Sequence, residues 1–182
     1  MCFGVVRSVI YCIVGVFAGL ALVGCVGPKL KTEERQKLPI PMEITVSAQV
    51  DVNPAADGRP SPVFVRVFEL ANDSRFLSAD YSELIKQEVV TLEGDVISSE
   101  GRSLIPGEGW FVRKNASFQT RFVGVAAGYR DTGRIWRAVT PMPEPYLAGR
   151  LWTKSVSPTM RLYVRLDSGG VTLLREAETP QK

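Results

Sequence analysis

Side chains that commonly carry catalysis or bind metals are sparse in this 182-residue sequence. It contains no histidine, which excludes Ser-His-Asp and Cys-His catalysis and every histidine-ligated metal site. It also contains no phosphate-binding loop, no zinc or calcium-loop pattern and no nucleophile elbow. These absences narrow the chemistry that the chain could carry out.

One acidic group has a spacing that would suit chemistry with paired carboxylates. Glu83, Glu88, Glu93 and Asp95 lie within or just after a segment of helical periodicity, and two nearby carboxylates are typical of general acid and base catalysis. A solvated helical face explains the same residues. Both interpretations stay open at this point.

Charge argues against a nucleic-acid partner. The 22 Lys and Arg residues nearly balance the 19 Asp and Glu residues, for a net charge of +3. The arginines are scattered between Arg66 and Arg165, whereas nucleic-acid-binding domains usually gather basic residues on one face.

Residues 1–24 have the composition of an export signal. No residue between Arg7 and Lys29 is charged, so a membrane-spanning helix of about 20 residues is one interpretation. A short basic start followed by an apolar core of about 7–15 residues is typical of a secretory signal. The sequence Leu22-Val-Gly-Cys25 favours the signal, because it resembles the lipobox in which bacterial lipoproteins are cleaved before an acylated cysteine.

Cys25 would be the sole cysteine after cleavage, because Cys2 and Cys12 lie within the predicted signal peptide. Acylation would remove a thiol that is a liability in an oxidising compartment. Stable membrane attachment needs about two acyl chains, which this type of lipidation supplies. Val26 follows in place of aspartate, so the lipoprotein resemblance implies the outer membrane, with the protein facing the periplasm.

The rest of the chain divides into a tether, a domain and a tail. Residues 25–42 are rich in proline and charge and are expected to form a flexible tether. Residues 43–175 are expected to form a single β domain, and residues 176–182 a polar C-terminal tail.

Hydrophobic periodicity in the domain predicts mainly strands. Ile44 to Val52 alternates with period two, and Val63 to Leu70 is apolar on both faces, which indicates a central strand. Phe76 to Val90 shows helical spacing, so one or two short helical turns are expected after the second strand. Further strands are predicted at 104–105, 109–112, 117–129, 134–139, 150–156 and 160–166, the last forming a hairpin with 171–174. This pattern predicts a two-sheet antiparallel β-sandwich.

The loop between the first two predicted strands is a candidate binding site. It is longer than a hairpin requires, and its prolines restrict it before any partner binds, which lowers the entropic cost of docking. A variable surface loop is the alternative, and the residues alone do not separate the two. The loop residues are Asn53, Pro54, Ala55, Ala56, Asp57, Gly58, Arg59, Pro60, Ser61 and Pro62.

A second candidate segment runs from Phe122 to Arg137. Gly124 and Gly128 interrupt its apolar run, which suggests bulges or close sheet packing. Trp136 is expected in the core, and Arg130 or Arg137 is expected to pair with a carboxylate. The pattern favours a structural role over a binding site.

Several of these segments together resemble the TssJ (SciN-like) lipoproteins of bacterial type VI secretion. The resemblance covers essentially the whole mature domain, with its motifs in order. They are the lipobox at 22–25, the loop at 53–62 running into the strand at 63–70, the patch at 76–85, Leu104-Ile-Pro-Gly107, and Val123 to Asp131 with Trp136-Arg137.

The resemblance implies a transthyretin-like β-sandwich with a small helical addition, anchored through Cys25 in the inner leaflet of the outer membrane. It implies binding to the periplasmic C-terminal part of TssM, within a TssJ–TssL–TssM complex that links the two membranes. The family's partner-contact loop corresponds to Asn53–Pro62. No catalytic residue, metal or cofactor is implied.

Binding of a small ligand or glycan on the sandwich is the alternative function. Trp110, Trp136, Trp152 or Tyr129 would then supply stacking surfaces. An enzyme ranks third, because no residue pattern supports one.

Overall fold

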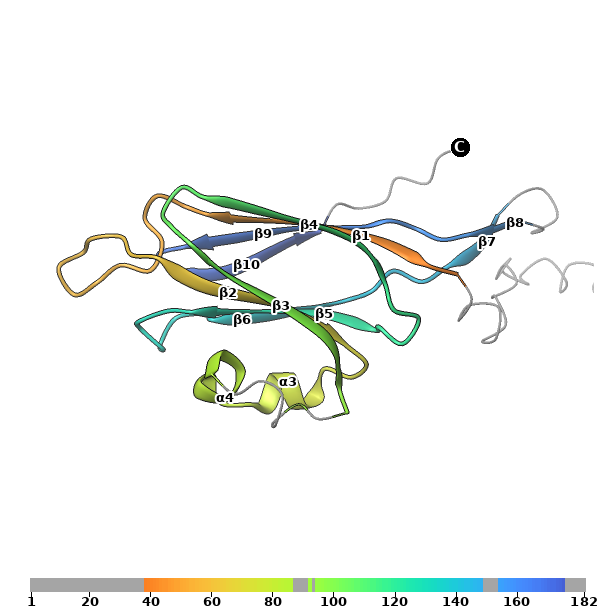
Figure 1. The fold of residues 1–182 in the computed structure, drawn as a ribbon, viewed down its shortest axis with the longest axis horizontal. Coiled ribbons are helices and arrows are strands. Elements are labelled where there is room, and N and C mark those ends of the chain that lie inside the picture. Colours follow the sequence, from red (N-terminus) through yellow and green to blue (C-terminus); the bar gives the residue numbers. More distant parts are fainter. Residues whose placement is uncertain (1–37, 87–91, 93, 149–153, 176–182) are drawn as a thin grey trace, which may run out of the picture.

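The protein is a β-sandwich with a short helical segment on one face (Figure 1). The computed structural model describes residues 38–86, 92, 94–148 and 154–175. The predicted signal peptide, Cys25 and the C-terminal tail lie outside the described residues, as do Glu88, Glu93 and Trp152. Within the described part, no helix has the length and apolar character needed to cross a membrane.

The first sheet has the strand order β10-β9-β1-β4. Its strands are β1 (Ile40–Ala48), β4 (Gly109–Ala116), β9 (Met160–Asp167) and β10 (Gly170–Arg175). The predicted hairpin of β9 and β10 is confirmed. The pairing of β1 with β9 is parallel, whereas its pairing with β4 is antiparallel. Because β1 begins at Ile40, the last three residues of the predicted tether form part of a strand.

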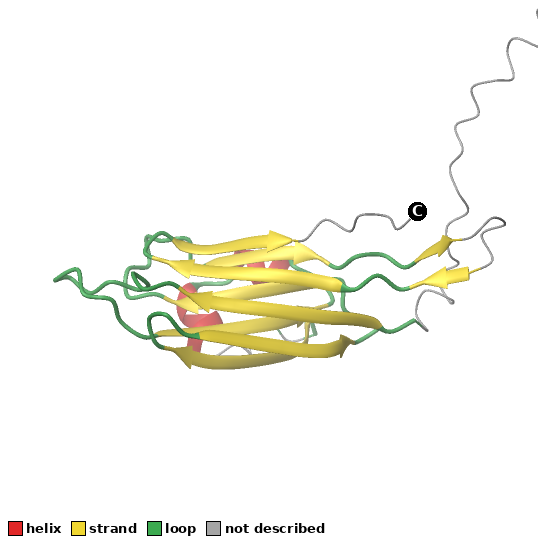
Figure 2. Cartoon of the chain, turned by 90° about the horizontal axis from the view of Figure 1, so that it is seen from above, coloured by secondary structure: helices red, strands yellow, loops and turns green. Residues whose placement is uncertain are grey.

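The second sheet has the strand order β3-β2-β5-β6, with antiparallel pairing throughout. Its strands are β2 (Val63–Leu70), β3 (Val96–Leu104), β5 (Phe122–Gly128) and β6 (Arg137–Pro141). The predicted central position of β2 is confirmed. A separate pair, β7 (Tyr146–Ala148) and β8 (Lys154–Val156), projects beyond one end of the sandwich (Figure 2).

The main core lies between the two sheets, because the inward-facing residues of their alternating strands are apolar. Residues such as Ile44, Val65, Val125 and Leu162 are at most 1% exposed. Burial of such side chains is worth about 1.5–3 kcal/mol each relative to exposure. The predicted two-sheet sandwich is therefore confirmed.

The helical segment follows β2, as predicted, and covers the outer face of the second sheet (Figure 1). It consists of α3 (Ser74–Ser78) and α4 (Tyr81–Lys86). Phe76 packs edge-on against Phe68 at 5.3 Å between ring centroids. Glu83 accepts the backbone N–H of Asp80 at 2.7 Å, so its carboxylate stabilises the start of α4.

The segment from Phe122 to Arg137 supports this helical cover. Gly124 lies against Phe76, where an added Cβ would be 2.9 Å from the ring. The Arg137 guanidinium donates to the carbonyl oxygens of Phe76 and Ala79 and stacks on Trp136 at 4.6 Å. Trp136 is partly buried and packs against the main core as well as against the apolar residues beneath the helical segment. This segment has the structural role that was predicted. Arg137, however, donates to carbonyl oxygens, whereas a carboxylate was expected as the partner of Arg130 or Arg137.

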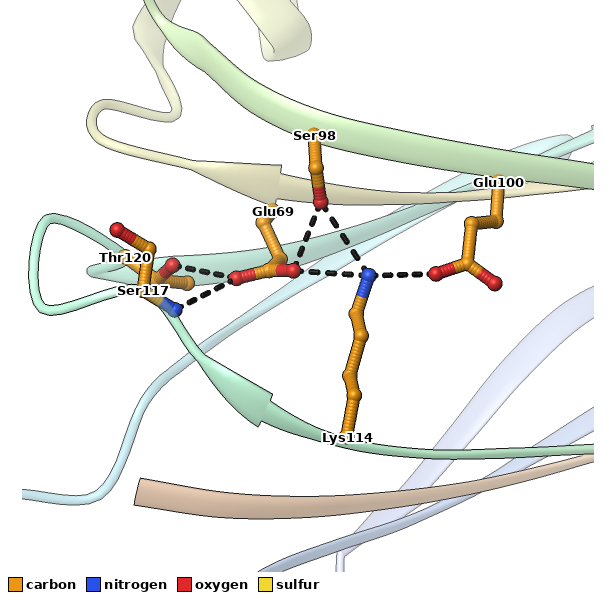
Figure 3. Close-up of polar contacts among 6 residues, drawn as sticks. All are labelled: Glu69, Ser98, Glu100, Lys114, Ser117 and Thr120. Atoms are coloured by element: carbon orange, nitrogen blue, oxygen red, sulfur yellow. Dashed lines mark hydrogen bonds and ion pairs between the residues drawn. The ribbon is translucent and has the colours of Figure 1, made fainter. Parts of the chain in front are cut away.

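A polar network joins the two sheets near the β4–β5 loop (Figure 3). Glu69 of β2 is 4% exposed and pairs with Lys114 of β4 at 2.9 Å. Ser98 and Thr120 donate to the same carboxylate, each at 2.7 Å, and the Ser117 N–H donates at 3.1 Å. Burial alone would raise the pKa of Glu69, but these hydrogen bonds outweigh it and hold the pKa below 4.5.

Candidate partner-binding surface

The two ends of the sandwich differ in what they present. The loop end carries four connections, at 49–62, 105–108, 129–136 and 168–169. The opposite end, named here the Leu38 end, is where the described chain begins. Strand β1 starts at the Leu38 end and runs into the loop end, so the long β1–β2 loop projects away from the chain start (Figures 1 and 2).

Asn53 closes the base of the β1–β2 loop. It is 3% exposed and has a left-handed backbone with φ +48°, which asparagine tolerates better than most residues. Its side-chain amide donates to the Pro62 carbonyl oxygen at 2.7 Å and accepts the Arg130 N–H at 2.8 Å. One side chain therefore holds both ends of the loop together and attaches them to the β5–β6 loop.

The tip of the same loop is exposed but internally bonded. The Ala55 N–H donates to the Arg59 carbonyl oxygen at 2.8 Å, and the Gly58 N–H donates to the Ala55 carbonyl oxygen at 2.9 Å. Gly58 has φ +79°, a conformation that favours glycine. Asp57 accepts the Arg59 N–H at 3.1 Å. The tip is thus a defined turn.

The ten predicted contact residues therefore divide into two groups. Asn53 and Ser61 are buried, and the Ser61 N–H donates to the Val52 carbonyl oxygen at 3.1 Å. Residues 56–60 and Pro62 are exposed, and Pro54 and Ala55 are half-buried. The buried group shapes the loop, and the exposed group is available to a partner. The loop also connects strands of different sheets, which explains why it is longer than a hairpin requires.

Hydrogen bonds link the β1–β2 loop to its neighbours. Ser168 donates to the Asp51 carboxylate at 2.7 Å and lowers the pKa of Asp51. Arg134 donates to the Ser168 carbonyl oxygen. The Gly107 N–H donates to the Ala48 carbonyl oxygen at 2.9 Å. The connections at 49–62, 129–136 and 168–169 are therefore bonded to one another, and the connection at 105–108 is bonded to the last residue of β1.

The loop end also exposes large apolar side chains that the sequence assigned to strands. Val50, Ile105 and Ile135 are 75%, 60% and 64% exposed. The expectation that Val50 continues the buried face of the first strand is wrong, because β1 ends at Ala48. Each residue lies within a few positions of turn-forming residues, for example Ile105 before Pro106-Gly107. That proximity was the available signal for a loop.

The proposed stacking residues of a ligand site do not form an exposed aromatic surface in the described part. Tyr129 is 2% exposed, and burial raises the pKa of its hydroxyl. Trp110 and Trp136 are partly buried against the core. Trp152 lies outside the described residues. The fold therefore uses Tyr129 and these two tryptophans in packing.

Several ionisable groups of the described residues are held in ion pairs or hydrogen bonds that stabilise the fold. No three of the described Asp and Glu residues gather as metal ligands. Lys114 is desolvated, which alone would lower its pKa, but Glu100 and Glu69 raise it. Desolvation lowers the pKa of Arg66 and Arg137. The loop end offers a defined turn and exposed apolar side chains, which suit binding to a protein.

Solved structures of type VI secretion proteins are similar to this chain. The chain is 28% identical to the type VI secretion lipoprotein TssJ1 of Pseudomonas aeruginosa, with a TM-score of 0.66, covering 78% of this chain and 100% of that one. It is 26% identical to Serratia marcescens Lip, a membrane-bound component of the type VI secretion system, with a TM-score of 0.65 and the same coverages.

A third match is a chain from a structure described as the TssM C-terminal domain from EAEC. It is 26% identical, with a TM-score of 0.54, covering 75% of this chain and 98% of that one. No curated protein sequence matched.

Family comparison gives the assignment directly. Residues 41–168 match the family described as "Type VI secretion lipoprotein, VasD, EvfM, TssJ, VC_A0113". The match begins at the second residue of β1 and ends just after β9, so it spans nearly the whole sandwich. The chain belongs to the TssJ family of type VI secretion lipoproteins.

Proposed function

We propose that this lipoprotein is held in the outer membrane by acylated Cys25, faces the periplasm and binds the periplasmic C-terminal part of TssM through the β1–β2 loop. It would thereby join the outer membrane to an inner-membrane complex of TssM and TssL. In this proposal residues 1–24 are a cleaved signal peptide, residues 25–42 supply the tether, and the protein positions its partner without catalysing a reaction.

The placement of the β1–β2 loop is the observation that carries this proposal. The loop projects from the end of the sandwich opposite the chain start (Figure 1). A domain tethered through residues before Leu38 can therefore direct its loop end away from the membrane. The match with a chain from the TssM structure and the family assignment support TssM as the partner.

The rigidity of the loop supports a binding role. Asn53 fixes its base and the Ala55–Arg59 hydrogen bond fixes its turn. A loop ordered before binding loses less conformational entropy on docking. Val50, Ile105 and Ile135 are exposed at the same end and would add apolar contacts to those of the ten predicted residues.

Pull-down with the TssM periplasmic domain tests the loop assignment. Residues 56–60 are replaced by Gly and Ser at equal length, which leaves Asn53 and Ser61 in place. We expect this variant to lose TssM, and Arg59→Ala to bind less. Arg113→Ala is the matched control, because both arginines are exposed, at 86% and 70%, and each pairs with one carboxylate.

Three results would count against the proposal. Equal binding by the loop variant and the wild type would remove the loop from the interface. Equal losses in Arg59→Ala and Arg113→Ala would indicate a non-specific charge effect. Absence of binding by folded wild type would favour the small-ligand or glycan alternative.

Membrane fractionation tests the anchor separately. Cys25→Ser removes the acylated sulfur and is expected to release the protein from the outer-membrane fraction. Mass spectrometry of the wild type should find acyl chains on Cys25 at a new N-terminus. An unlipidated protein that still fractionates with the outer membrane would contradict the anchor assignment.

A further inference from the structure

The Leu38 end presents an exposed aromatic residue on a well-held loop. Phe118, in the β4–β5 loop, is 56% exposed. Its neighbours Ser117 and Thr120 both donate to the buried Glu69 carboxylate, as Figure 3 shows. Arg121 donates to the Phe118 carbonyl oxygen at 2.9 Å. The network that joins the two sheets therefore also holds Phe118 out into solvent.

Apolar surface continues on one side of Phe118, where a groove is lined by Leu38, Ile40, Pro141 and Met142. A shallower groove on its other side, which Gln119 and Arg121 help to line, is mainly polar. Tyr146, at the start of β7, is 46% exposed on the element that projects from this end (Figure 2).

The start of the described chain lies beside this surface. Ile40 pairs with Ala116, the last residue of β4, so the β4–β5 loop begins where β1 begins. Leu38 lines the same groove as Phe118. Residues 26–37 separate Leu38 from Cys25, and twelve residues span at most about 40 Å when fully extended.

We propose that the β4–β5 loop, through Phe118, contacts the phospholipid surface of the membrane that carries the Cys25 anchor, so that the sandwich stands end-on with its loop end directed away. The membrane and its anchor come from the proposed function. Aromatic side chains favour the boundary between acyl chains and headgroups. The Arg121 guanidinium, beside Phe118, has the geometry to bind lipid phosphate.

Tethering makes a contact of this size effective. A single exposed aromatic residue binds a bilayer weakly, but attachment at Cys25 makes the contact intramolecular and raises its effective concentration into the range of about millimolar. The rigid loop adds to this, because Phe118 needs no rearrangement before it meets the surface.

Depth-dependent fluorescence quenching tests the contact. Residues 25–182 contain one cysteine, so the protein can be coupled through Cys25 to a maleimide lipid in vesicles of phosphatidylethanolamine and phosphatidylglycerol. Phe118→Trp is compared with Phe111→Trp, whose site on the outer face of the first sheet is 53% exposed. We expect lipids brominated near the headgroup to quench an added emission component in Phe118→Trp and none in Phe111→Trp.

The alternative results each overturn the proposal. Equal quenching of both variants would mean that the sandwich lies on its side, and quenching of neither would mean that this end does not touch lipid. Loss of TssM pull-down in Phe118→Ser would assign the surface to a protein. Circular dichroism of each variant checks folding.

The proposal and the function on which it rests can fail separately. Chemical coupling bypasses acylation in the cell, so the vesicle result does not depend on whether Cys25 is lipidated. Conversely, a confirmed outer-membrane location and TssM binding would stand if Phe118 proved to be unquenched.

Discussion

Asn53 combines backbone conformation and side-chain bonding at one position. Its left-handed φ turns the chain out of the core after Val52, and its amide reaches both Pro62 and Arg130. Because the amide is buried, removing it leaves a donor and an acceptor without a protein partner. The shape of the exposed tip therefore depends on a residue that a partner does not need to touch.

Asn53→Ala is expected to lower the free energy of unfolding by about 2 kcal/mol, because it removes two buried hydrogen bonds. Alanine is also less favourable than asparagine at positive φ, because it has no polar side chain to bond locally. Asn53→Gly should recover about 1 kcal/mol of this loss, because glycine accepts the conformation. Urea unfolding measures both. Equal stability of the alanine and glycine variants would show that backbone conformation contributes nothing here.

The Glu69 carboxylate is the clearest pH-sensitive group described. Its folded-state pKa lies below the ordinary 4.5, so its ionised form contributes stability that is fully present above pH 4.5 and is lost as pH falls through the folded-state value. We expect the stability of the wild type to decline more steeply below pH 4.5 than that of Glu69→Gln, measured by urea unfolding over pH. Parallel curves would contradict this role.

Glu100→Gln is the matched control for this experiment. Its carboxylate binds the same Lys114 at 2.7 Å but is 46% exposed. At pH 7 we expect Glu69→Gln to cost about 2–3 kcal/mol and Glu100→Gln less than about 1 kcal/mol.

At the scale of elements, β5 is shaped by the helical segment that packs on it. Gly124→Ala would bring a Cβ within 2.9 Å of Phe76, so we expect a loss of about 1–3 kcal/mol from overpacking. Phe76→Leu should cost less in the Gly124→Ala background than in the wild type, as a double-mutant cycle of unfolding free energies would measure. Gly109→Ala, with 3.6 Å of space, is the control. Additive losses would exclude direct crowding.

The sequence predicted elements whose apolar pattern is set by the core. The alternation of β9 and the apolar faces of β2 identified both strands, because each inward position is buried. Most of β3 was missed, since Ser98, Ser99 and Arg102 give no apolar alternation on a sheet-edge strand that is largely exposed or half-buried. The parallel pairing of β1 with β9 was also missed, because alternation does not specify a neighbour.

Only part of the candidate site could be predicted from the sequence, because local patterns do not reveal tertiary contacts. Proline spacing identified the β1–β2 loop, because proline and glycine restrict a chain locally. The contribution of Ile105 and Ile135 was missed, because apolar residues beside a turn look like strand ends until tertiary structure shows them exposed. The linking role of Asn53 depends on Arg130, 77 positions away, and no local pattern predicts that contact.

At the scale of the whole molecule, the two ends are expected to act independently, because changes at distant sites without shared partners usually add. Phe118→Ser should therefore bind the TssM periplasmic domain within about twofold of the wild type. The Gly/Ser variant of residues 56–60 should leave the vesicle quenching of Phe118→Trp unchanged. Calorimetry and fluorescence measure the two effects, and a loss at both ends from either change would indicate coupling through the sandwich.

The position of β1 determines how the domain would carry tension. A pull applied before Leu38 and opposed at the β1–β2 loop runs along β1, which is hydrogen-bonded to β9 on one side and β4 on the other. Both points of attachment lie at the two ends of this one strand, so its covalent backbone carries the load and neither ladder has to break. A protein held between two membranes in this way would transmit tension through a single strand in the interior of a sheet, with the rest of the sandwich left unloaded.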